Sequence, residues 1–430
     1  MKKAIICFPK INNIIWDQTQ FPIGIYKIKQ YCKGKYDVII LDERLEEDIF
    51  TCIDELLDED ILCLGLSVMT GEQIRSAIKL SKRYHGKTAI VWGGVHPTIL
   101  PVNTMKADFI DYIIRGDGEE AFLNLLTYLD NGKVEQELFM SKENENLNIN
   151  YLNDLNKSNI DFATEKIYTE YFLKRDGMKK VFTIETSRGC PHRCAFCHNT
   201  ILGHNYRTAD TNYVISAIEC LKNQYSIDGI AFQEDNFFLN INRVKELVEY
   251  MRNLKDFGWK ANSRISYFSK LLKNKELMNK IVESNCKVLQ FGIESGSDRI
   301  LKLINKRITV NEILDINRKL SKYNLTLRYN FIIGFPTETV NEIDNTIHLI
   351  DRLMCENPHL EPPFVNIYTP YPGTPIFDLA VKMGFVPPQT LEEWADISWN
   401  KTNNMIHDKK IETKIYDLSN SFLKNNQYLR

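Results

Sequence analysis

Short apolar runs alternate with amphipathic stretches from Lys3 to about Leu129. The apolar runs predict buried strands at Lys3–Phe8, Asp37–Leu41, Ile61–Val68, Thr88–Trp92 and Phe109–Ile114. Helical periodicity predicts helices at Ile23–Cys32, Asp48–Leu57, Glu72–Tyr84 and Glu119–Leu129. Continuous apolar strands separated by helices are typical of a doubly wound parallel sheet. We therefore expect an N-terminal α/β domain over residues 1–130.

Strand and helix patterns alternate six more times between Lys180 and about Pro375. The predicted strands are Val181–Thr186, Gly229–Gln233, Lys260–Ile265, Val288–Ile293, Thr326–Ile333 and Phe364–Thr369. This repetition predicts a second α/β domain over residues 179–375. Residues 131–178 are polar and turn-rich, and we expect a linker that packs across the face of the second domain. Residues 376–430 are expected to form a short helical C-terminal tail.

Composition excludes some classes of partner. Lys+Arg total 54 and Asp+Glu total 56, a formal net charge of −2, so nothing indicates nucleic acid or an anionic membrane. No apolar stretch approaches about 18 residues, and the apolar run at the N-terminus is too short for a signal peptide. Of the ten cysteines, seven are scattered, as expected for buried thiols in a reducing compartment. We expect a soluble cytoplasmic protein.

The remaining three cysteines stand close together, as Cys190-x-x-x-Cys194-x-x-Cys197. The preceding apolar strand and the turn residues Gly189 and Pro191 indicate a tight loop at a strand end. A structural zinc site needs four ligands, and no fourth cysteine is nearby. A [4Fe–4S] cluster with one unligated iron fits three ligands better. The alternatives are a zinc knuckle or three unrelated cysteines.

This motif, with the aromatic Phe196 before its last cysteine, resembles the cluster motif of the radical S-adenosylmethionine (radical SAM) enzymes. The resemblance implies that the six strand–helix units form a partial (β/α)6 TIM-like barrel, whose active site would lie at the C-terminal ends of the strands. It also implies that the open iron binds the amino and carboxylate groups of SAM, which is cleaved to methionine and a 5′-deoxyadenosyl radical. Cys190, Cys194 and Cys197 would ligate the cluster.

Polar residues at the later strand ends match further segments of the family. By the resemblance, Glu234 or Asp235 would receive the methionine ammonium, although Asp235 with Asn236 is also a good helix cap. Ser263 and Arg264 end the third predicted strand, and from their chemistry we expect the serine to bond the ribose of SAM and the arginine to pair with its carboxylate. The segment that begins at Gly292 is similar to the family's G-x-E-S-G-S and would bring Glu294 and Ser295 to the ribose and methionine. Gly334 belongs to a turn similar to G-x-P-x-E under the adenine.

Glycines also follow three strands of the first domain, where they allow a ligand to approach the backbone closely. No G-x-G-x-x-G follows the first strand, so a dinucleotide site is not indicated, and ordinary turns are the alternative. The phrases G-G-x-H-P-T and R-G-x-G-E resemble those of the Rossmann-like cobalamin-binding domain that precedes some radical SAM cores. By that resemblance the cobalamin site would comprise Ser67, Met69, Thr70, Gly93, Gly94, Val95, Gly116, Gly118 and Glu119.

Many cobalamin proteins contain D-x-H-x-x-G, whose histidine binds cobalt. This chain has no such motif, because His85 lacks the spacing and His96 lies in a Gly-Pro loop. We therefore predict cobalamin without a protein histidine ligand and with the backbone of Val68–Gly71 beneath the corrin.

Together the resemblances imply a cobalamin-dependent radical SAM methyltransferase. Such an enzyme transfers a methyl group from methylcobalamin to an unactivated carbon, or phosphorus, of a small molecule; a peptide substrate stays open. An electron donor such as flavodoxin or ferredoxin is implied as a partner. The sequence identifies no catalytic acid or base. The alternatives are a non-methylating rearrangement or cyclisation, a non-catalytic cobalamin-binding protein, and an N-terminal domain that holds no corrin.

Overall fold

The computed structural model describes residues 1–11, 19–57, 60–203, 205–398, 409, 411–415 and 417. These residues form two compact units. The first comprises Met1–Glu170 and Pro387–Ser398. The second comprises Tyr171–Val386 and the described residues beyond 408. The segment Pro387–Ser398 therefore belongs to the first unit although the residues before it, and the described residues beyond 408, belong to the second.

The first unit is built on a six-stranded sheet with the order β2-β1-β3-β4-β5-β6. Its strands are β1 (Lys3–Phe8), β2 (Asp37–Asp42), β3 (Ile61–Ser67), β4 (Ala89–Gly93), β5 (Tyr112–Ile113) and β6 (Met140–Ser141). Neighbours pair in parallel except β5 and β6, which pair antiparallel. The doubly wound sheet expected from the apolar runs is confirmed, and the short β6 was not predicted.

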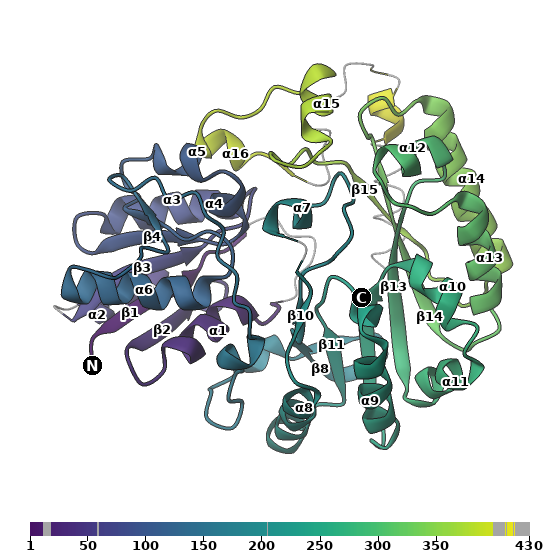
Figure 1. The fold of residues 1–430 in the computed structure, drawn as a ribbon, viewed down its shortest axis with the longest axis horizontal. Coiled ribbons are helices and arrows are strands. Elements are labelled where there is room, and N and C mark those ends of the chain that lie inside the picture. The colour runs from purple at the N-terminus through teal and green to yellow at the C-terminus, as the bar shows by residue number, and fades with distance from the viewer. Residues whose placement is uncertain are drawn as a thin grey trace. The chain divides into compact units, whose positions relative to one another are not determined.

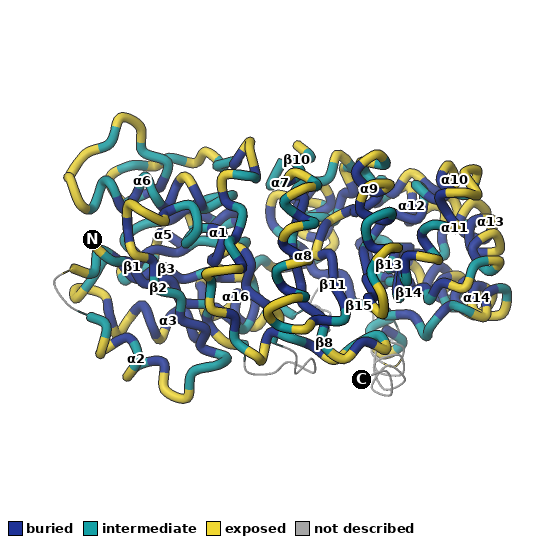
Figure 2. The backbone as a smooth tube through the Cα atoms, turned by 90° about the horizontal axis from the view of Figure 1, so that it is seen from below, coloured by how far each residue is buried: buried dark blue, intermediate teal, exposed yellow. Residues whose placement is uncertain are grey.

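Helices cover both faces of this sheet (Figure 2). They are α1 (Ile23–Cys32), α2 (Ile49–Leu56), α3 (Gln73–Tyr84), α4 (Val95–Ile99), α5 (Pro101–Met105), α6 (Gly118–Asn131) and α16 (Leu391–Trp394). α1 packs against α6 on one face. The apolar residues of α2, α3 and α16 join those of β1, β3 and β4 in one core on the other face.

The segment from 131 to 170 also belongs to the first unit. Asn150 N donates to the Arg115 carbonyl at 2.9 Å, and Lys29 Nζ lies 2.6 Å from Glu165 Oε1. These contacts differ from the sequence prediction, which packed this segment across the second domain. The polar composition gave no apolar face from which its partner could be identified.

The second unit contains a seven-stranded sheet with the order β15-β14-β13-β12-β11-β8-β7. Its strands are β7 (Leu173–Arg175), β8 (Met178–Ile184), β11 (Gly229–Phe232), β12 (Gly258–Ser263), β13 (Cys286–Glu294), β14 (Thr326–Ile333) and β15 (Phe364–Ile367). All pairs are parallel except β7 with β8. The sheet curls into a partial barrel (Figure 1). The predicted fold class is confirmed.

The barrel's helices follow its strands. They are α7 (Asn199–Leu202), α8 (Thr211–Tyr225), α9 (Ile241–Arg252), α10 (Phe268–Leu271), α11 (Lys275–Glu283), α12 (Asp298–Leu303), α13 (Val310–Leu320), α14 (Val340–Glu356) and α15 (Phe377–Lys382). A small ribbon pairs β9 (Ser187–Arg188) with β10 (Arg207–Thr208). Capping boxes at Thr309–Glu312 and Thr339–Glu342 begin α13 and α14. Short 3₁₀ turns occur at Leu155–Ser158, Thr169–Tyr171, Phe237–Leu239 and Ile265–Tyr267.

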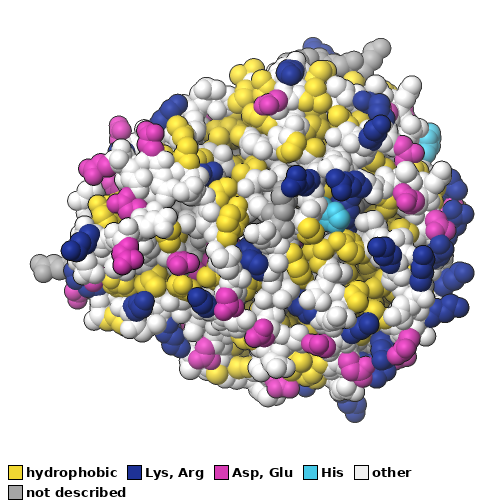
Figure 3. Space-filling view, in the orientation of Figure 1, with side chains coloured by type: hydrophobic (Ala, Val, Ile, Leu, Met, Phe, Trp, Pro, Cys, Tyr) yellow, Lys and Arg dark blue, Asp and Glu magenta, His cyan; other side chains and the backbone are white. Residues whose placement is uncertain are grey.

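The predicted C-terminal tail is only partly described. Residues 411–415 are helical, and the remaining residues of the tail beyond 398 lie largely outside the described part. Within the described residues no helix is long and apolar enough to cross a membrane. Cationic and anionic side chains are interspersed over the face drawn in Figure 3, in line with the net charge of −2.

Candidate active site

The three-cysteine loop follows β9 and is fastened to several parts of the barrel. Ala195 N donates to the Ile304 carbonyl at 2.8 Å, and the Ala195 carbonyl accepts from Ile376 N at 3.1 Å. Asn305 Nδ2 donates to the Arg193 carbonyl at 2.7 Å. These bonds come from segments that follow two different strands, β13 and β15, so they restrain the backbone of the loop.

The three thiols influence one another electrostatically, and all are free of disulfides. Burial raises the pKa of Cys197 to about 12, with smaller contributions from Cys194 and Asp235. Burial also raises the pKa of Cys190. Across the described residues, no three His, Cys, Asp or Glu side chains converge on a single ion position. A [4Fe–4S] cluster does not need such convergence, because each thiolate binds a different iron.

The two adjacent acids Glu234 and Asp235, after β11, have different environments. Glu234 is 5% exposed and forms an ion pair with Arg243. Its carboxylate also accepts from Ser187 Oγ at 2.5 Å and from the Thr186 hydroxyl. Asp235 is exposed and contributes to the pKa of both Cys190 and Cys197. Asp235 is therefore near enough to the cysteine loop to act electrostatically on two of its thiols, while the carboxylate of Glu234 is paired with Arg243.

The end of β12 supplies hydrogen-bond donors next to the loop. Ser263 Oγ lies 3.1 Å from Asn236 Oδ1, and Arg264 Nη1 lies 3.1 Å from Cys194 Sγ. Asn236 Nδ2 and Arg264 Nη2 are buried and find no partner among the described residues. Two unpaired donors beside an exposed carboxylate suit a ligand that carries both a carboxylate and an ammonium group, because each charge meets its complement.

Glu294, the last residue of β13, forms an ion pair with a lysine that the sequence analysis did not identify. Glu294 has a positive φ of 75° and pairs with buried Lys306 at 2.5 Å. The Lys306 ammonium lies 6.0 Å from the centroid of the Phe196 ring. Ser295 is fully buried and lies against Thr346 of α14. Glu294 is thus next to the cysteine loop, whereas Ser295 supports the helix behind it.

The turn after β14 is shaped by one carboxylate. Glu338 Oε2 accepts from Gly334 N at 2.6 Å and from Phe335 N at 3.1 Å. Burial raises the pKa of Glu338 to about 7. The Phe335 ring lies 5.8 Å from Phe196 and 5.2 Å from Tyr368, so the turn adjoins the cysteine loop through aromatic contacts.

In the first unit, the loops after β3 and β4 are locked together. Val68 N donates to the Gly93 carbonyl at 2.8 Å, and His96 N donates to the Val68 carbonyl at 3.0 Å. Gly94 has a φ of 94°, and a Cβ there would lie 2.8 Å from Val68 O. Only glycine fits this crossing of two backbones. Ser67, Val95 and Thr70 are partly exposed beside it, and Met69 is 49% exposed.

The predicted residues after β5 lie at the same edge of the sheet. Gly116 N donates to Thr98 Oγ1 at 3.0 Å, which ties this loop to α4. Gly118 begins α6 and lies against Ile28 of α1. Glu119 is 1% exposed. Parallel strands present their carboxyl ends at one edge, so the three predicted glycine loops come together there.

Neither histidine of the first unit points to an exposed position at this edge. His96 is fully buried, and burial lowers its pKa to about 3. His85 follows α3 and bridges to Thr88 just before β4, at the opposite edge of the sheet. Cobalamin without a histidine ligand remains a prediction.

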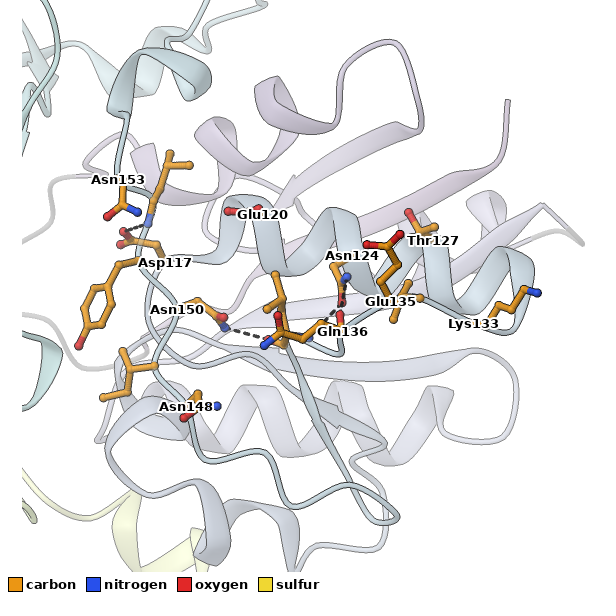
Figure 4. A pocket seen from close by; sticks show the side chains of 15 residues that line it. Asp117, Glu120, Asn124, Thr127, Lys133, Glu135, Gln136, Asn148, Asn150 and Asn153 are labelled. Carbon is orange, nitrogen blue, oxygen red and sulfur yellow. Dashed lines mark hydrogen bonds between the residues drawn. The ribbon is translucent and has the colours of Figure 1, made fainter.

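A further pocket of about 980 Å³ lies between α6 and the segment 133–153 (Figure 4). Its amide side chains are used within the protein. Asn124 Nδ2 donates to the Gln136 carbonyl at 2.9 Å, and Asn150 Nδ2 donates to the Leu138 carbonyl at 2.8 Å. The arrangement fastens the segment onto the helix.

The residues therefore fit the three groups that the sequence implies. The cysteine loop offers thiols, the strand ends beside it offer a carboxylate and unpaired donors, and the first unit offers a glycine-lined edge. Sequence reasoning missed Asn236 as a donor and also missed Lys306, Arg243 and Tyr267. Tyr267 Oη lies 3.0 Å from His192 Nε2 of the cysteine loop. No local pattern marks these residues, because each is brought to the site by tertiary contacts.

Comparison with known proteins agrees with both units. Residues 184–350 match the radical SAM superfamily, and residues 14–126 match the B12 binding domain. An uncharacterised methyltransferase of Pyrococcus horikoshii is 30% identical over 84% of this chain and 78% of its own length. The anaerobic magnesium-protoporphyrin IX monomethyl ester cyclase of Rubrivivax gelatinosus is 24% identical over 83% of this chain, which spans 65% of the cyclase.

Among solved structures, the radical SAM methyltransferase TsrM of Kitasatospora setae superposes with a TM-score of 0.72. It is 15% identical and covers 90% of this chain and 79% of its own, so the likeness concerns the fold. This chain belongs to the radical SAM superfamily and is a cobalamin-dependent radical SAM enzyme. Its cofactors are a [4Fe–4S] cluster, SAM and cobalamin.

Proposed function

We propose that this enzyme is a methyltransferase acting on a small molecule. The observation that carries the proposal is the likeness to the Pyrococcus horikoshii methyltransferase, which extends over 84% of the chain and includes both units. The cysteine loop and the donors around it support a working SAM site in this chain. The cyclase from Rubrivivax gelatinosus supports a second candidate, a non-methylating ring closure.

Within the proposal, Cys190, Cys194 and Cys197 hold the cluster. When bound, the cluster supplies the electron that cleaves SAM, and cobalamin supplies the methyl group. Asp235 binds the ammonium of SAM, since it is an exposed acid close to the cysteines, whereas its neighbour Glu234 is paired with Arg243.

Unpaired donors on Asn236 and Arg264 support binding of the SAM carboxylate. Ser263 binds the ribose, and Gly334 lies under the adenine. Phe196 and Glu294 line the same site from the loop and from β13.

In the first unit, the proposed cobalamin site is the glycine-lined edge. Its members are Ser67, Met69, Thr70, Gly93, Gly94, Val95, Gly116, Gly118 and Glu119. An external one-electron donor completes the proposal, because cleavage of SAM at the cluster consumes an electron.

The test is anaerobic reconstitution with iron, sulfide and hydroxocobalamin, followed by incubation with SAM and a strong reductant. Mass spectrometry then follows 5′-deoxyadenosine and S-adenosylhomocysteine. Formation of both products supports methyl transfer, because S-adenosylhomocysteine records a methyl group that has left SAM. Formation of 5′-deoxyadenosine alone supports the ring-closing candidate.

A matched pair of variants controls for unrelated SAM breakdown. Replacement of Cys190, Cys194 and Cys197 by alanine is expected to abolish 5′-deoxyadenosine and the bound iron. Cys355→Ala, at an exposed cysteine of the same unit, is expected to retain both. Equal 5′-deoxyadenosine from the two variants would refute a radical mechanism at this loop.

A further inference from the structure

The loop Val68–Gly71, between β3 and α3, is hydrogen-bonded on its buried side to His96, a residue with no assigned role. Thr70 Oγ1 lies 3.2 Å from His96 Nδ1, and this hydrogen bond joins residues at the ends of two neighbouring strands. On the other side of the loop, Met69 N donates to Gln73 Oε1 at 2.7 Å. Gln73 Nε2 in turn donates to the Pro9 carbonyl at 2.7 Å. The loop is therefore held at two successive residues.

His96 is enclosed by a segment from the far end of the chain. The ring of Trp394, in α16, meets the His96 ring edge-on with centroids 6.2 Å apart. Trp394 is 1% exposed and packs in the same core as Ile74 and Trp92. The segment Pro387–Ser398, called here the returning segment, also contacts α3 and α5. Arg75 of α3 pairs with Asp396, and Asn103 Nδ2 of α5 donates to the Gln389 carbonyl.

The two sides of the loop differ in exposure. Met69 is 49% exposed and Thr70 is partly exposed, whereas His96 is fully buried. His96 Nε2 is buried and finds no partner in the described part of the chain. The imidazole thus makes its one hydrogen bond to Thr70. Because His96 itself is closed to water, losing that bond would leave a second buried polar atom of the ring without a partner, which is costly.

We propose that His96 is a positioning residue for cobalamin: through Thr70 it sets the loop Val68–Gly71, and Trp394 of the returning segment packs against the buried imidazole and holds it in place. The inference rests on the proposed role of Thr70 in the cobalamin site. Under this proposal, His96 supports the loop from the interior of the first unit. Pro387–Ser398 then contributes to the cobalamin site by packing against His96.

The test measures cobalamin binding rather than turnover. Hydroxocobalamin is titrated into cobalamin-free protein and followed by its absorbance. Thr70→Val and His96→Leu each remove the hydrogen bond and are expected to weaken binding roughly three- to tenfold. The double variant is expected to lose no more than either single variant, because both remove the same interaction.

Conservative variants separate positioning from bulk packing. Thr70→Ser keeps the hydroxyl, and His96→Asn keeps a polar atom near the position of Nδ1, so both are expected to bind cobalamin nearly as the parent does. His85→Gln, at the opposite edge of the sheet, is the matched control and is expected to bind unchanged. The iron content of each variant verifies that the second unit is intact.

The possible results are distinguishable. Unchanged affinity in Thr70→Val and His96→Leu, or additive losses in the double variant, would overturn the positioning role while leaving the methyltransferase proposal in place. Failure of the parent protein to bind hydroxocobalamin would overturn the proposed cobalamin site itself.

Discussion

Glu234 and Arg243 form an ion pair from which solvent is excluded, with Arg243 Nη2 2.9 Å from Glu234 Oε1 and side chains 3% and 0% exposed for Arg243 and Glu234. Hydroxyl groups of Thr186 and Ser187 complete the shell of the carboxylate. Glu234 therefore joins β11 to α9 and to the strand before the cysteine loop. Asp235, one residue later, lies outside this cluster.

Arg243→Met is expected to destabilise the protein by about 3–5 kcal/mol, because it leaves the carboxylate of Glu234 buried without its cation. Urea denaturation followed by circular dichroism measures the free energy of unfolding. Lys319→Met removes the cation of an exposed pair with Asp315, where both side chains are more than half exposed (55% and 54%). That control is expected to change stability by less than about 1 kcal/mol. Similar losses in both variants would contradict a special role for the buried pair.

Asp235→Asn is expected to weaken SAM binding about 10- to 100-fold, the range for loss of a hydrogen bond to a charged group. Equilibrium dialysis of SAM against the reconstituted protein measures the dissociation constant. The bound iron should stay at the parent level, because the three cysteines are untouched. Glu276→Gln, an exposed acid on α11, is the control and should bind SAM as the parent does. Unchanged affinity in Asp235→Asn would exclude this carboxylate from the SAM site.

The fold was largely predictable because its strands are continuous apolar runs. Lys3–Phe8, Ile23–Cys32 and Thr326–Ile333 match β1, α1 and β14 at both ends. The two-residue β6 and the three-residue β7 carry too few residues for a periodic signal. The return of Pro387–Ser398 to the first unit was not predictable either, because the partner of an apolar face is a tertiary property.

The motif residues of the site could be predicted from the sequence, but the side chains with which they form ion pairs could not. The motif residues do lie at strand ends, since parallel strands present their carboxyl ends together. The sequence left Glu234 and Asp235 equivalent, and Arg243 distinguishes them only once α9 is folded against β11. Nothing in the sequence distinguishes Lys306 from the other lysines. Only the path of the folded chain after α12 places it beside Glu294.

Glu338→Gln is expected to remove a pH-dependent contribution to the free energy of unfolding. Burial raises the pKa of this carboxyl from 4.5 to about 7 in the folded protein, so its neutral form is favoured by folding. The contribution is fully present below pH 4.5 and is lost as pH rises through about 7. Relative to Glu338→Gln, the parent should lose about 2–3 kcal/mol between pH 5 and pH 8. Urea denaturation of both proteins at the two pH values measures the difference, and equal pH dependence would contradict it.

Trp394→Ala is expected to destabilise the first unit by about 3–5 kcal/mol, because a large ring that is 1% exposed leaves a cavity in the core. The loss should appear in the first unit although the residue follows the barrel in sequence. Limited proteolysis located by mass spectrometry checks this, with cleavage expected in residues 1–170. Val386→Ala, at a side chain 78% exposed just before the segment, is the control. Cleavage confined to the second unit would contradict the assignment of this segment.

Gly94→Ala is expected to destabilise the first unit and to weaken cobalamin binding together. A Cβ at Gly94 would lie 2.8 Å from Val68 O and 2.9 Å from Val68 N, and the φ of 94° is strained for alanine. The strain costs about 1–3 kcal/mol, and part of it is relieved only if the loop after β3 moves. Gly24→Ala in α1 is the matched control, because a Cβ there meets nothing within 4 Å. It should stabilise the protein by up to about 1 kcal/mol and leave the affinity for hydroxocobalamin unchanged. Gly94→Ala could also lose stability while binding cobalamin as the parent does. The contact between Gly94 and Val68 would then be structural only. In that case cobalamin binding would not depend on the position of the loop after β3.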